Sequence, residues 1–167
     1  MNPDSTDHTS SGPSLSRTNS TEAQPELASE PAAYWTRLAY ESVIAFTRVQ
    51  QRRRGFTQPQ FWLLRHLSPK DLAMNERGQT VPELVTAMSS YLRQEDDLAA
   101  EAAVLVERGL LTTDGGRLRI TSAGEAAREE WAGAAGPIRA LIHDGIDDVD
   151  YATTVKVLQR LIHNTRQ

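Results

Sequence analysis

The 167-residue sequence predicts a mainly helical domain that contains one short β-hairpin. Apolar residues recur at spacings of three and four along most of the chain, which is the period of an amphipathic helix. Three Ser/Thr-x-x-Glu/Gln boxes, at residues 57–60, 80–83 and 122–125, mark helix starts. The period changes to two around residues 111–121, where an Asp-Gly-Gly sequence separates two strand-like runs.

Composition and charge exclude several classes of protein. The chain has no cysteine, which excludes disulfides and thiolate metal sites and leads us to expect a reducing, cytoplasmic location. No stretch approaches the roughly 18 apolar residues of a membrane span, and the first residues do not have the pattern of a secretory signal. The 18 Lys and Arg against 22 Asp and Glu give a net charge of −4, which by itself argues against nucleic acid as a partner.

Residues 1–31 differ in composition from the rest of the chain. They contain 11 Ser and Thr and 4 Pro, and apart from Met1 their only large aliphatic side chains are Leu15 and Leu27. Such a segment buries too little apolar surface to offset the entropy of ordering, so we expect a disordered tail. Five acids and one arginine lie in it, so the tail carries the whole net charge and residues 32–167 are neutral overall.

The apolar pattern predicts six helices after the tail. The first spans about residues 32–54 and ends at Gly55, a type of residue that often follows a helix. The others start at the boxes of Thr57 and Thr80, at Gln94, at Ser122 with Thr121 as an alternative cap, and at about Asp150. The fifth is expected to bend at Gly133, Gly136 and Pro137. The third is expected to turn Val81, Leu84, Val85 and Met88 inward, and the fourth Leu98, Ala102, Leu105 and Val106.

Between the fourth and fifth helices, residues 111–121 alternate apolar and polar side chains. The Asp-Gly-Gly sequence favours a tight turn between two strands. In the second strand Leu118 and Ile120 would face the core, whereas Arg117 and Arg119 would face outward. The predicted order is therefore four helices, one hairpin and two further helices.

This is the order of a winged helix-turn-helix domain with flanking helices, and the sequence resembles the MarR family of bacterial transcriptional regulators over roughly residues 32–165. Residues 80–84, Thr-Val-Pro-Glu-Leu, are similar to the start of that family's first helix-turn-helix helix. Residues 105–111, Leu-Val-Glu-Arg-Gly-Leu-Leu, are similar to the end of its recognition helix. Ile-Thr-Ser-Ala-Gly at 120–124 is similar to the segment that leads out of its wing.

The resemblance implies a homodimer that binds double-stranded operator DNA. Residues 57–121 would form the DNA-binding winged helix, and residues 32–56 and 122–167 the dimerisation helices. The apolar surface of the flanking helices agrees with an interface, and packing on their own domain is the alternative. The family also implies a pocket for a small-molecule effector between these helices and the winged domain. Aromatic side chains that would line it, or pack in the core instead, are Tyr34, Trp35, Tyr40, Phe61 and Trp62.

The predicted recognition helix is acidic, which conflicts with DNA binding. Residues 79–108 contain six acidic and two basic residues, whereas affinity for DNA depends on cations at the phosphates. Glu95, Asp96 and Asp97 would lie in the first turn of this helix, and Glu101 follows one turn later. A helix that is capped for stability and does not enter a groove is therefore an alternative to groove insertion.

Polar and basic residues near this helix are the candidates for DNA contact. Arg93 and Gln94 precede the acidic run, and Arg117 and Arg119 lie on the wing, where an arginine can reach the minor groove. The largest run of positive charge is elsewhere, at residues 48–65. Its three consecutive arginines end a predicted helix, where pairing with the helix dipole explains them better than phosphate contact.

The sequence carries no motif of an enzyme. Its four histidines show no metal-ligand spacing, and there is no Walker loop, GxGxxG or GxSxG. The acidic turn at residues 147–150 lacks the glycine and distal glutamate of an EF-hand. We therefore expect no catalytic residue, metal or cofactor. The alternative to a DNA-binding regulator is a winged-helix dimer that has lost DNA affinity and serves as a protein-interaction or ligand-sensing module.

Overall fold

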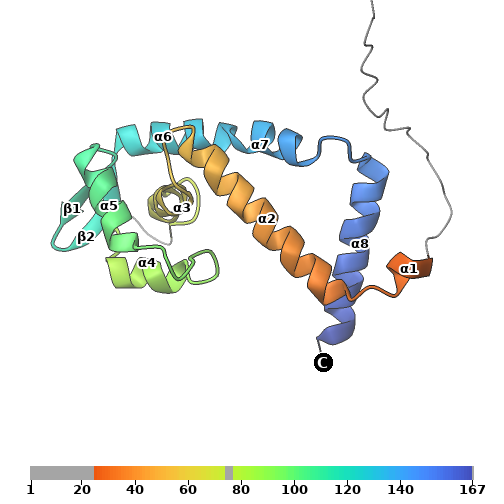
Figure 1. The fold of residues 1–167 in the computed structure, drawn as a ribbon. Coiled ribbons are helices and arrows are strands. Elements are labelled where there is room, and N and C mark those ends of the chain that lie inside the picture. The colour runs from red at the N-terminus through yellow and green to blue at the C-terminus, as the bar shows by residue number, and fades with distance from the viewer. Residues whose placement is uncertain (1–24, 74–76, 167) are drawn as a thin grey trace, which may run out of the picture.

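A computed structural model describes residues 25–73 and 77–166 and has the expected mainly helical fold (Figure 1). Its elements are α1 (Pro25–Ala28), α2 (Ala32–Arg52), α3 (Gln58–Leu67), α4 (Val81–Ala87), α5 (Leu98–Glu107), β1 (Leu111–Asp114), β2 (Arg117–Ile120), α6 (Ser122–Gly133), α7 (Ala135–Ile142) and α8 (Asp148–Thr165). Most of the predicted disordered tail, residues 1–24, lies outside the described residues. Residues 25–28, which were also assigned to the tail, form the short helix α1.

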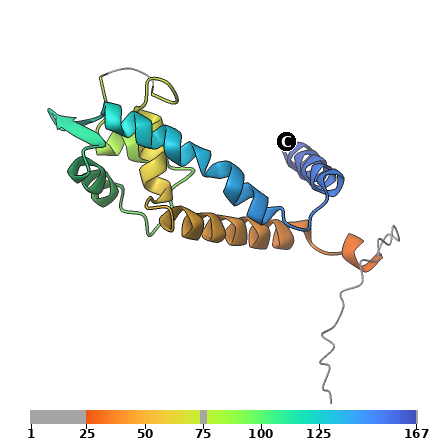
Figure 2. The same cartoon turned by 90° about the horizontal axis from the view of Figure 1, so that it is seen from above.

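The molecule has a compact unit at one end and an open arrangement of long helices at the other (Figures 1 and 2). α3, α4, α5 and the β1–β2 hairpin form the compact unit, which we call the winged unit. α6 and α7 follow each other along one edge of the molecule, and α2 runs obliquely away from them. α8 returns from the end of α7 toward the beginning of α2.

The hydrophobic core belongs to the winged unit. Its fully buried apolar side chains are Leu63, Leu64, Leu84, Met88, Leu105 and Leu111. Trp131 of α6 joins this core by stacking on Phe56, with ring centroids 4.7 Å apart and 6° between the ring planes. Phe56 lies in the short loop between α2 and α3, so this stack connects the end of α2 to α6.

Local sequence signals set the helix starts. The predicted capping boxes at Thr57 and Thr80 are confirmed, since each threonine oxygen accepts a backbone N–H bond from the residue three positions later and the reciprocal bond is also present. The predicted third box is wrong, and the alternative cap Thr121 begins α6. Glu125, which would have closed that box, accepts hydrogen bonds from Ser68 and Arg128 instead.

Two residues that were expected to face inward are exposed. Val85 of α4 and Val106 of α5 are 43% and 36% exposed. In each helix the preceding leucine, Leu84 or Leu105, is fully buried and occupies the core position. A rotation of about 100° per residue then places the valine at the edge of the apolar stripe.

The start of α5 also differs from the prediction. The helix begins at Leu98 and not at Gln94, because Asp97 caps it by accepting a hydrogen bond from a first-turn N–H. The fifth predicted helix is interrupted beside Gly133, since α6 ends there and α7 begins at Ala135, whereas Gly136 and Pro137 lie within the first turn of α7.

The predicted hairpin is confirmed as a two-residue turn between antiparallel strands. Its turn residues Gly115 and Gly116 have φ values of +57° and +76°. Two consecutive left-handed residues are typical of a type I′ turn, for which glycine is favoured. Leu118 is buried on the expected face, and its backbone also pairs with Gln79, which attaches the hairpin to the start of α4.

Candidate nucleic-acid interface

α4, α5 and the hairpin are arranged as a helix-turn-helix with a wing. α5 is anchored on one side by Leu98, Ala102 and Leu105, which lie in the core, and its other side faces solvent. The chain passes from α5 almost directly into β1, so the hairpin stands beside the helix. In winged helices the second helix of the pair is the element that enters the major groove.

A buried ion pair holds the N-terminal end of α5. Arg48 of α2 donates two hydrogen bonds to Asp96, at 2.8 and 2.7 Å, and one to Gln58 at 2.7 Å. The side chains of Arg48 and Asp96 are only 10% and 7% exposed. Burial alone would raise the pKa of Asp96. The hydrogen bonds from Arg48 and from the Arg93 N–H, together with the positive charges of both arginines, hold that pKa below its ordinary value.

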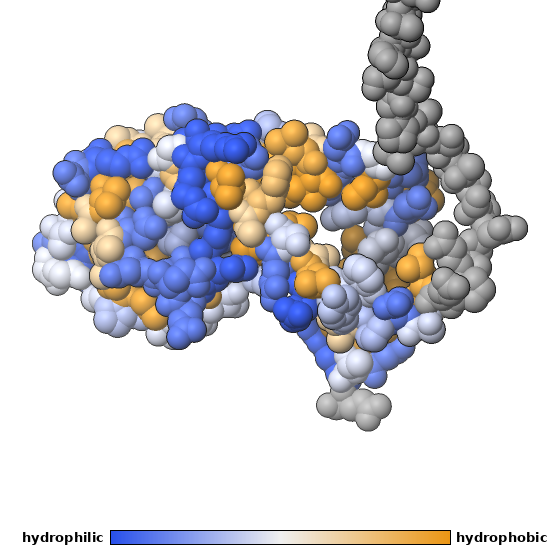
Figure 3. All heavy atoms as spheres, viewed as in Figure 1, coloured by the Kyte–Doolittle hydropathy of each residue, from blue (hydrophilic) through white to orange (hydrophobic). Residues whose placement is uncertain are grey.

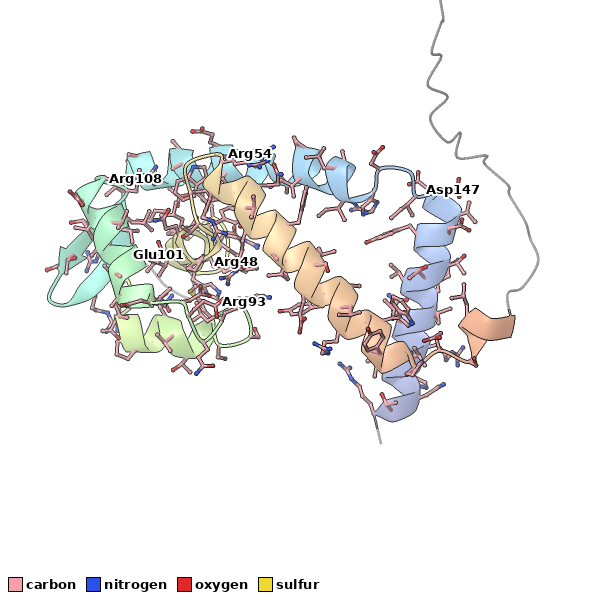
Figure 4. The ribbon with its side chains drawn as sticks, viewed as in Figure 1. Arg48, Arg54, Arg93, Glu101, Arg108 and Asp147 are labelled. Atoms are coloured by element: carbon pink, nitrogen blue, oxygen red, sulfur yellow. The ribbon has the colours of Figure 1, made fainter. Side chains whose placement is uncertain are left out.

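The other acids near the start of α5 have partners of their own. Asp97 caps the helix, and Glu101 accepts a hydrogen bond at 2.7 Å from Gln60 of α3. Figure 4 shows Arg48 and Glu101 beside α3, between α2 and α5. Glu95 remains largely exposed and lies 3.8 Å from Arg93. Three of the four acids noted in the sequence therefore stabilise the position of α5 and do not form a free acidic face.

The predicted contact residues before α5 lie in the loop between α4 and α5. Arg93 is half-buried; its backbone N–H donates to Asp96, and its guanidinium lies 3.8 Å from Glu95. Gln94 is exposed. Both residues flank the N-terminal end of α5, the end that approaches DNA in a helix-turn-helix.

The two wing arginines have different environments. Arg117 donates hydrogen bonds to the Gly78 carbonyl and, at 2.8 Å, to Glu83 of α4. The Thr80 N–H and the Arg117 guanidinium hold the pKa of Glu83 below its ordinary value. Arg117 thus joins the wing to α4.

Arg119, by contrast, is turned toward solvent. Its contact is a surface pair with Asp114, at 3.3 Å, between two exposed side chains. Such pairs stabilise a fold by at most about 1 kcal/mol. Arg119 is therefore the wing arginine that can most easily exchange its partner for a phosphate.

The outward side of α5 is apolar, a feature that the sequence did not lead us to expect. We use the name α5 apolar face for the exposed residues Ala99, Ala100, Ala103, Val104 and Val106. The other exposed residue of this helix, all of which is described, is Glu107. The alanines at 99, 100 and 103 are the sequence signal for this apolar face. The sequence pattern, however, predicts an acidic first turn and places Val106 in the core.

A hollow of about 480 Å³ separates α5 from the wing. Ala99, Ala103 and Val106 line it from the helix, and Thr113 and Leu118 from the hairpin. The side of the α5 apolar face that is nearer to the wing is therefore accessible and not covered by the hairpin.

A second cavity, of about 350 Å³, lies where α2 and α7 meet the winged unit. Its apolar lining includes Val43, Phe56, Phe61, Trp131, Ile138 and Ile142. Of the five aromatic residues predicted for an effector pocket, Phe61 lines this cavity. Gln51 also lines the cavity and is 8% exposed, and its Oε1 has no hydrogen-bond partner among the described residues. A buried acceptor without a partner costs about 1–3 kcal/mol, so it marks a polar position in an apolar cavity.

α2 and α8 enclose a third, larger apolar hollow, of about 810 Å³. Trp35 and Tyr40 line it from α2, and Val157 and Leu161 line it from α8. None of the residues of α8, all of which are described, is buried. Figure 3 shows further apolar side chains over α7 and around the space between α2 and α8.

Residues 25–73 and 77–166 lack two other classes of feature. Within these ranges, no group of three His, Cys, Asp or Glu side chains could hold a metal ion. No helix in the described part of the chain is long and apolar enough to cross a membrane.

Comparisons with known proteins identify the fold. No protein-family model matches the chain, and no curated protein matches it. Solved structures do match. The MarR family protein Rv2887 of Mycobacterium tuberculosis gives a TM-score of 0.63 at 18% identity, over 78% of this chain and 93% of that chain. Its complex with DNA gives 0.58 at 17% identity, over 79% and 98%.

Two further solved structures support the same assignment. A MarR family transcriptional regulator from Silicibacter pomeroyi gives a TM-score of 0.59 at 15% identity, over 87% of this chain and 100% of that chain. BpsR of Bordetella bronchiseptica, whose DNA binding is regulated by 6-hydroxynicotinic acid, gives 0.52 at 20% identity, over 81% and 96%. The chain therefore has a winged-helix fold. Its particular fold, with long helices on both sides of the winged unit, is the MarR fold.

We predict that the Arg48–Asp96 pair stabilises the position of α5. Asp96→Asn should lower the free energy of unfolding at pH 7 by about 3 kcal/mol, because it leaves the buried Arg48 with the exposed Glu95, at 3.9 Å, as its charged partner. Since the folded pKa of Asp96 is depressed, its contribution is full above the unfolded value of about 3.9 and is lost as pH falls through the folded value. The loss caused by the substitution should therefore shrink below pH 4, as measured by denaturant unfolding.

Asp114→Asn is the matched control for this measurement. It breaks the exposed pair with Arg119 and should cost less than about 1 kcal/mol. The double variant Arg48→Met/Asp96→Leu should be more stable than the single variants Arg48→Met and Asp96→Leu, since neither buried charge remains in it. Equal stabilities of the Asp96→Asn and Asp114→Asn proteins would contradict the prediction.

Proposed function

We propose that the chain is a homodimeric regulator that binds double-stranded DNA, with α5 in the major groove and the β1–β2 wing beside it, and that a small-molecule effector releases it. The observation that carries this proposal is the arrangement of α4, α5 and the hairpin, in which one side of α5 is anchored in the core and the other is open. The likeness to Rv2887, which has been solved with DNA, supports it. A regulator of this kind is not an enzyme.

Charge sets the expected strength of binding. Arg48 neutralises Asp96, which removes part of the repulsion that the sequence suggests, whereas Asp97 and Glu101 are hydrogen-bonded to neutral groups and keep their charge. Arg93 and Arg119 are the arginines beside α5 that pair only with exposed acids, at 3.8 and 3.3 Å. We therefore assign the phosphate contacts to these two residues, with Gln94 at the helix start and Arg117 as the support of the wing. Few cations at the interface mean weak binding that is most visible at low salt.

A gel-shift series at several salt concentrations tests DNA binding, using genomic fragments that include the DNA upstream of the protein's own gene. We expect Arg119→Ala to weaken binding and to reduce the slope of log K against log salt by about 0.9, because one phosphate is no longer neutralised. Lys70→Ala is the matched control, because it also removes one positive charge and breaks a surface pair, with Glu129 of α6. No binding to any fragment at low salt would refute the proposed function, whereas equal slopes would refute only the assignment of Arg119.

A second function is favoured by one observation. The outward side of α5 has no cation, and exposed Glu95 and Glu107 lie at its two ends. An apolar surface with acidic ends also suits a protein partner that has a basic, apolar segment. Absence of DNA binding at low salt, together with a stable complex in which α5 is protected from hydrogen exchange, would favour this second function.

The proposed homodimer explains the apolar surface of the long helices. α8 contributes apolar side chains to the hollow between α2 and α8 but buries none of its residues within the chain. Exposed Val157, Leu161 and Ile162 lie on this helix, and exposed Trp35 and Tyr40 lie on α2. Contiguous apolar surface of this kind marks an interface, and two-fold symmetry is the commonest way for identical chains to cover it.

We predict that Val157→Asp converts the dimer into a monomer. Val157 is 54% exposed within the chain, so the new carboxylate stays hydrated in the monomer and is desolvated only at the interface. Gln159→Asp introduces the same charge into the same helix at an exposed polar position and should leave the dimer intact. Light scattering after size exclusion measures the mass, and a wild-type protein that is monomeric at all concentrations would contradict the proposed dimer.

The cavity between α2 and α7 is the proposed effector site. Its apolar lining suits an aromatic body, the Gln51 Oε1 requires a hydrogen-bond donor, and Arg139 supplies a positive charge for a carboxylate. 6-Hydroxynicotinic acid, the regulator named for BpsR, has all three features and is a suitable probe. Because α2 also carries Arg48, a ligand against α2 can alter the position of α5.

Calorimetric titration with 6-hydroxynicotinic acid tests the site. We expect Gln51→Leu to weaken binding by about tenfold, since it removes one buried hydrogen bond. Gln159→Leu, on the exposed side of α8, should bind the probe as the wild type does. If the wild type and the Gln51→Leu variant bind equally well, the probe does not use this cavity.

A further inference from the structure

The α5 apolar face restricts what this helix can recognise in DNA. Its five side chains have neither a hydrogen-bond donor nor an acceptor, and all of them end in methyl groups. Base pairs in the major groove present donors and acceptors that are read by Arg, Lys, Asn, Gln, Glu or Asp. The apolar group that the major groove presents is the 5-methyl group of thymine.

The polar residues near the N-terminal end of α5 do not offer a different way to read bases. Glu101 is hydrogen-bonded to Gln60, and Asp97 is engaged as the helix cap. Arg108, just after the helix, donates to the Gly55 carbonyl and lies over the Trp131 ring at 5.3 Å, on the side of α6. Glu107 is exposed at the last position of the helix, beside the hollow next to the wing.

The small size of these side chains has a second effect. A helix with average side chains is about 10–12 Å across, close to the 12 Å width of the major groove. Alanines at 99, 100 and 103 make this side of α5 thinner, so its backbone can approach the floor of the groove. Methyl groups of alanine and valine then come within van der Waals distance of the base edges. The hollow between α5 and the wing leaves Ala99, Ala103 and Val106 accessible from the wing side as well.

We propose that α5 recognises thymine 5-methyl groups through Ala99, Ala100, Ala103 and Val104, and that the protein consequently selects A·T-rich sites by apolar contact. The inference rests on the proposed DNA-binding function. It adds that sequence is read without hydrogen bonds from α5, while Arg93 and Arg119 hold the phosphates on either side. Thymine and uracil are then distinguishable to this helix although they pair identically.

Replacement of thymine by deoxyuridine tests the proposal. Duplexes that bind the full-length protein are selected from a random 30-base-pair library at low salt, and each is remade with deoxyuridine in place of every thymine. We expect A·T-rich selected sequences and an affinity about fourfold lower for each methyl group that contacts the helix, the equivalent of about 0.8 kcal/mol. Fluorescence anisotropy with both forms gives the ratio of affinities.

Two variants distinguish recognition by α5 from a general preference for thymine. Ala103→Ser places a hydroxyl group on the α5 apolar face and should reduce the ratio of the two affinities. Ala126→Ser, at an exposed position of α6, should leave that ratio unchanged. Equal binding of the thymine and deoxyuridine duplexes would overturn the inference and leave the proposed DNA binding intact. Failure to select any duplex would refute the proposed function itself, and the inference with it.

Discussion

The ion pair between Arg48 and Asp96 is the interaction on which the arrangement of the molecule depends. It joins α2, one of the long flanking helices, to the loop that positions α5. Both side chains are buried, so the pair cannot be exchanged for water without a large cost. Gln58 and the Arg93 N–H complete the hydrogen bonding of the two partners. A rotation of α2 relative to the winged unit must therefore either move α5 or break this pair.

This connection links the three parts of the proposed function. The cavity that contains Gln51 and the hollow between α2 and α8 both lie against α2. Occupation of the cavity and association of two chains would each act on the same rigid helix. Since Arg48 lies less than one turn before Gln51, both events are close to the residue that holds α5. Coupling between the proposed effector site and α5 then needs no long series of intervening residues.

Features that depend on neighbouring residues were predictable from the sequence. The boxes at Thr57 and Thr80 and the Gly115-Gly116 turn form within a few residues, so their patterns are visible without a fold. The role of Asp96 was not predictable, because its partner lies 48 positions earlier in the chain. Reading that carboxylate as a free charge made the helix seem more repulsive to DNA than it is.

The apolar character of α5 was not predicted for a related reason. Whether a valine lies inside or outside a helix depends on which neighbour fills the core, and in α5 Leu105 fills it and leaves Val106 outside. The pocket that contains Gln51 could not be found from the sequence either, since its walls come from α2, α3, α6, α7 and α8. The fold class, by contrast, followed from the order of the elements.

The exposed condition of α8 has a thermodynamic consequence. An 18-residue helix that buries none of its residues within its own chain gains little stability from tertiary packing. In the proposed homodimer its stability would come from the second chain and would follow mass action. The helicity of this segment, and the unfolding temperature of the whole protein, would then rise with protein concentration. The amount of the protein in the cell would in this way set how much of it is fully folded.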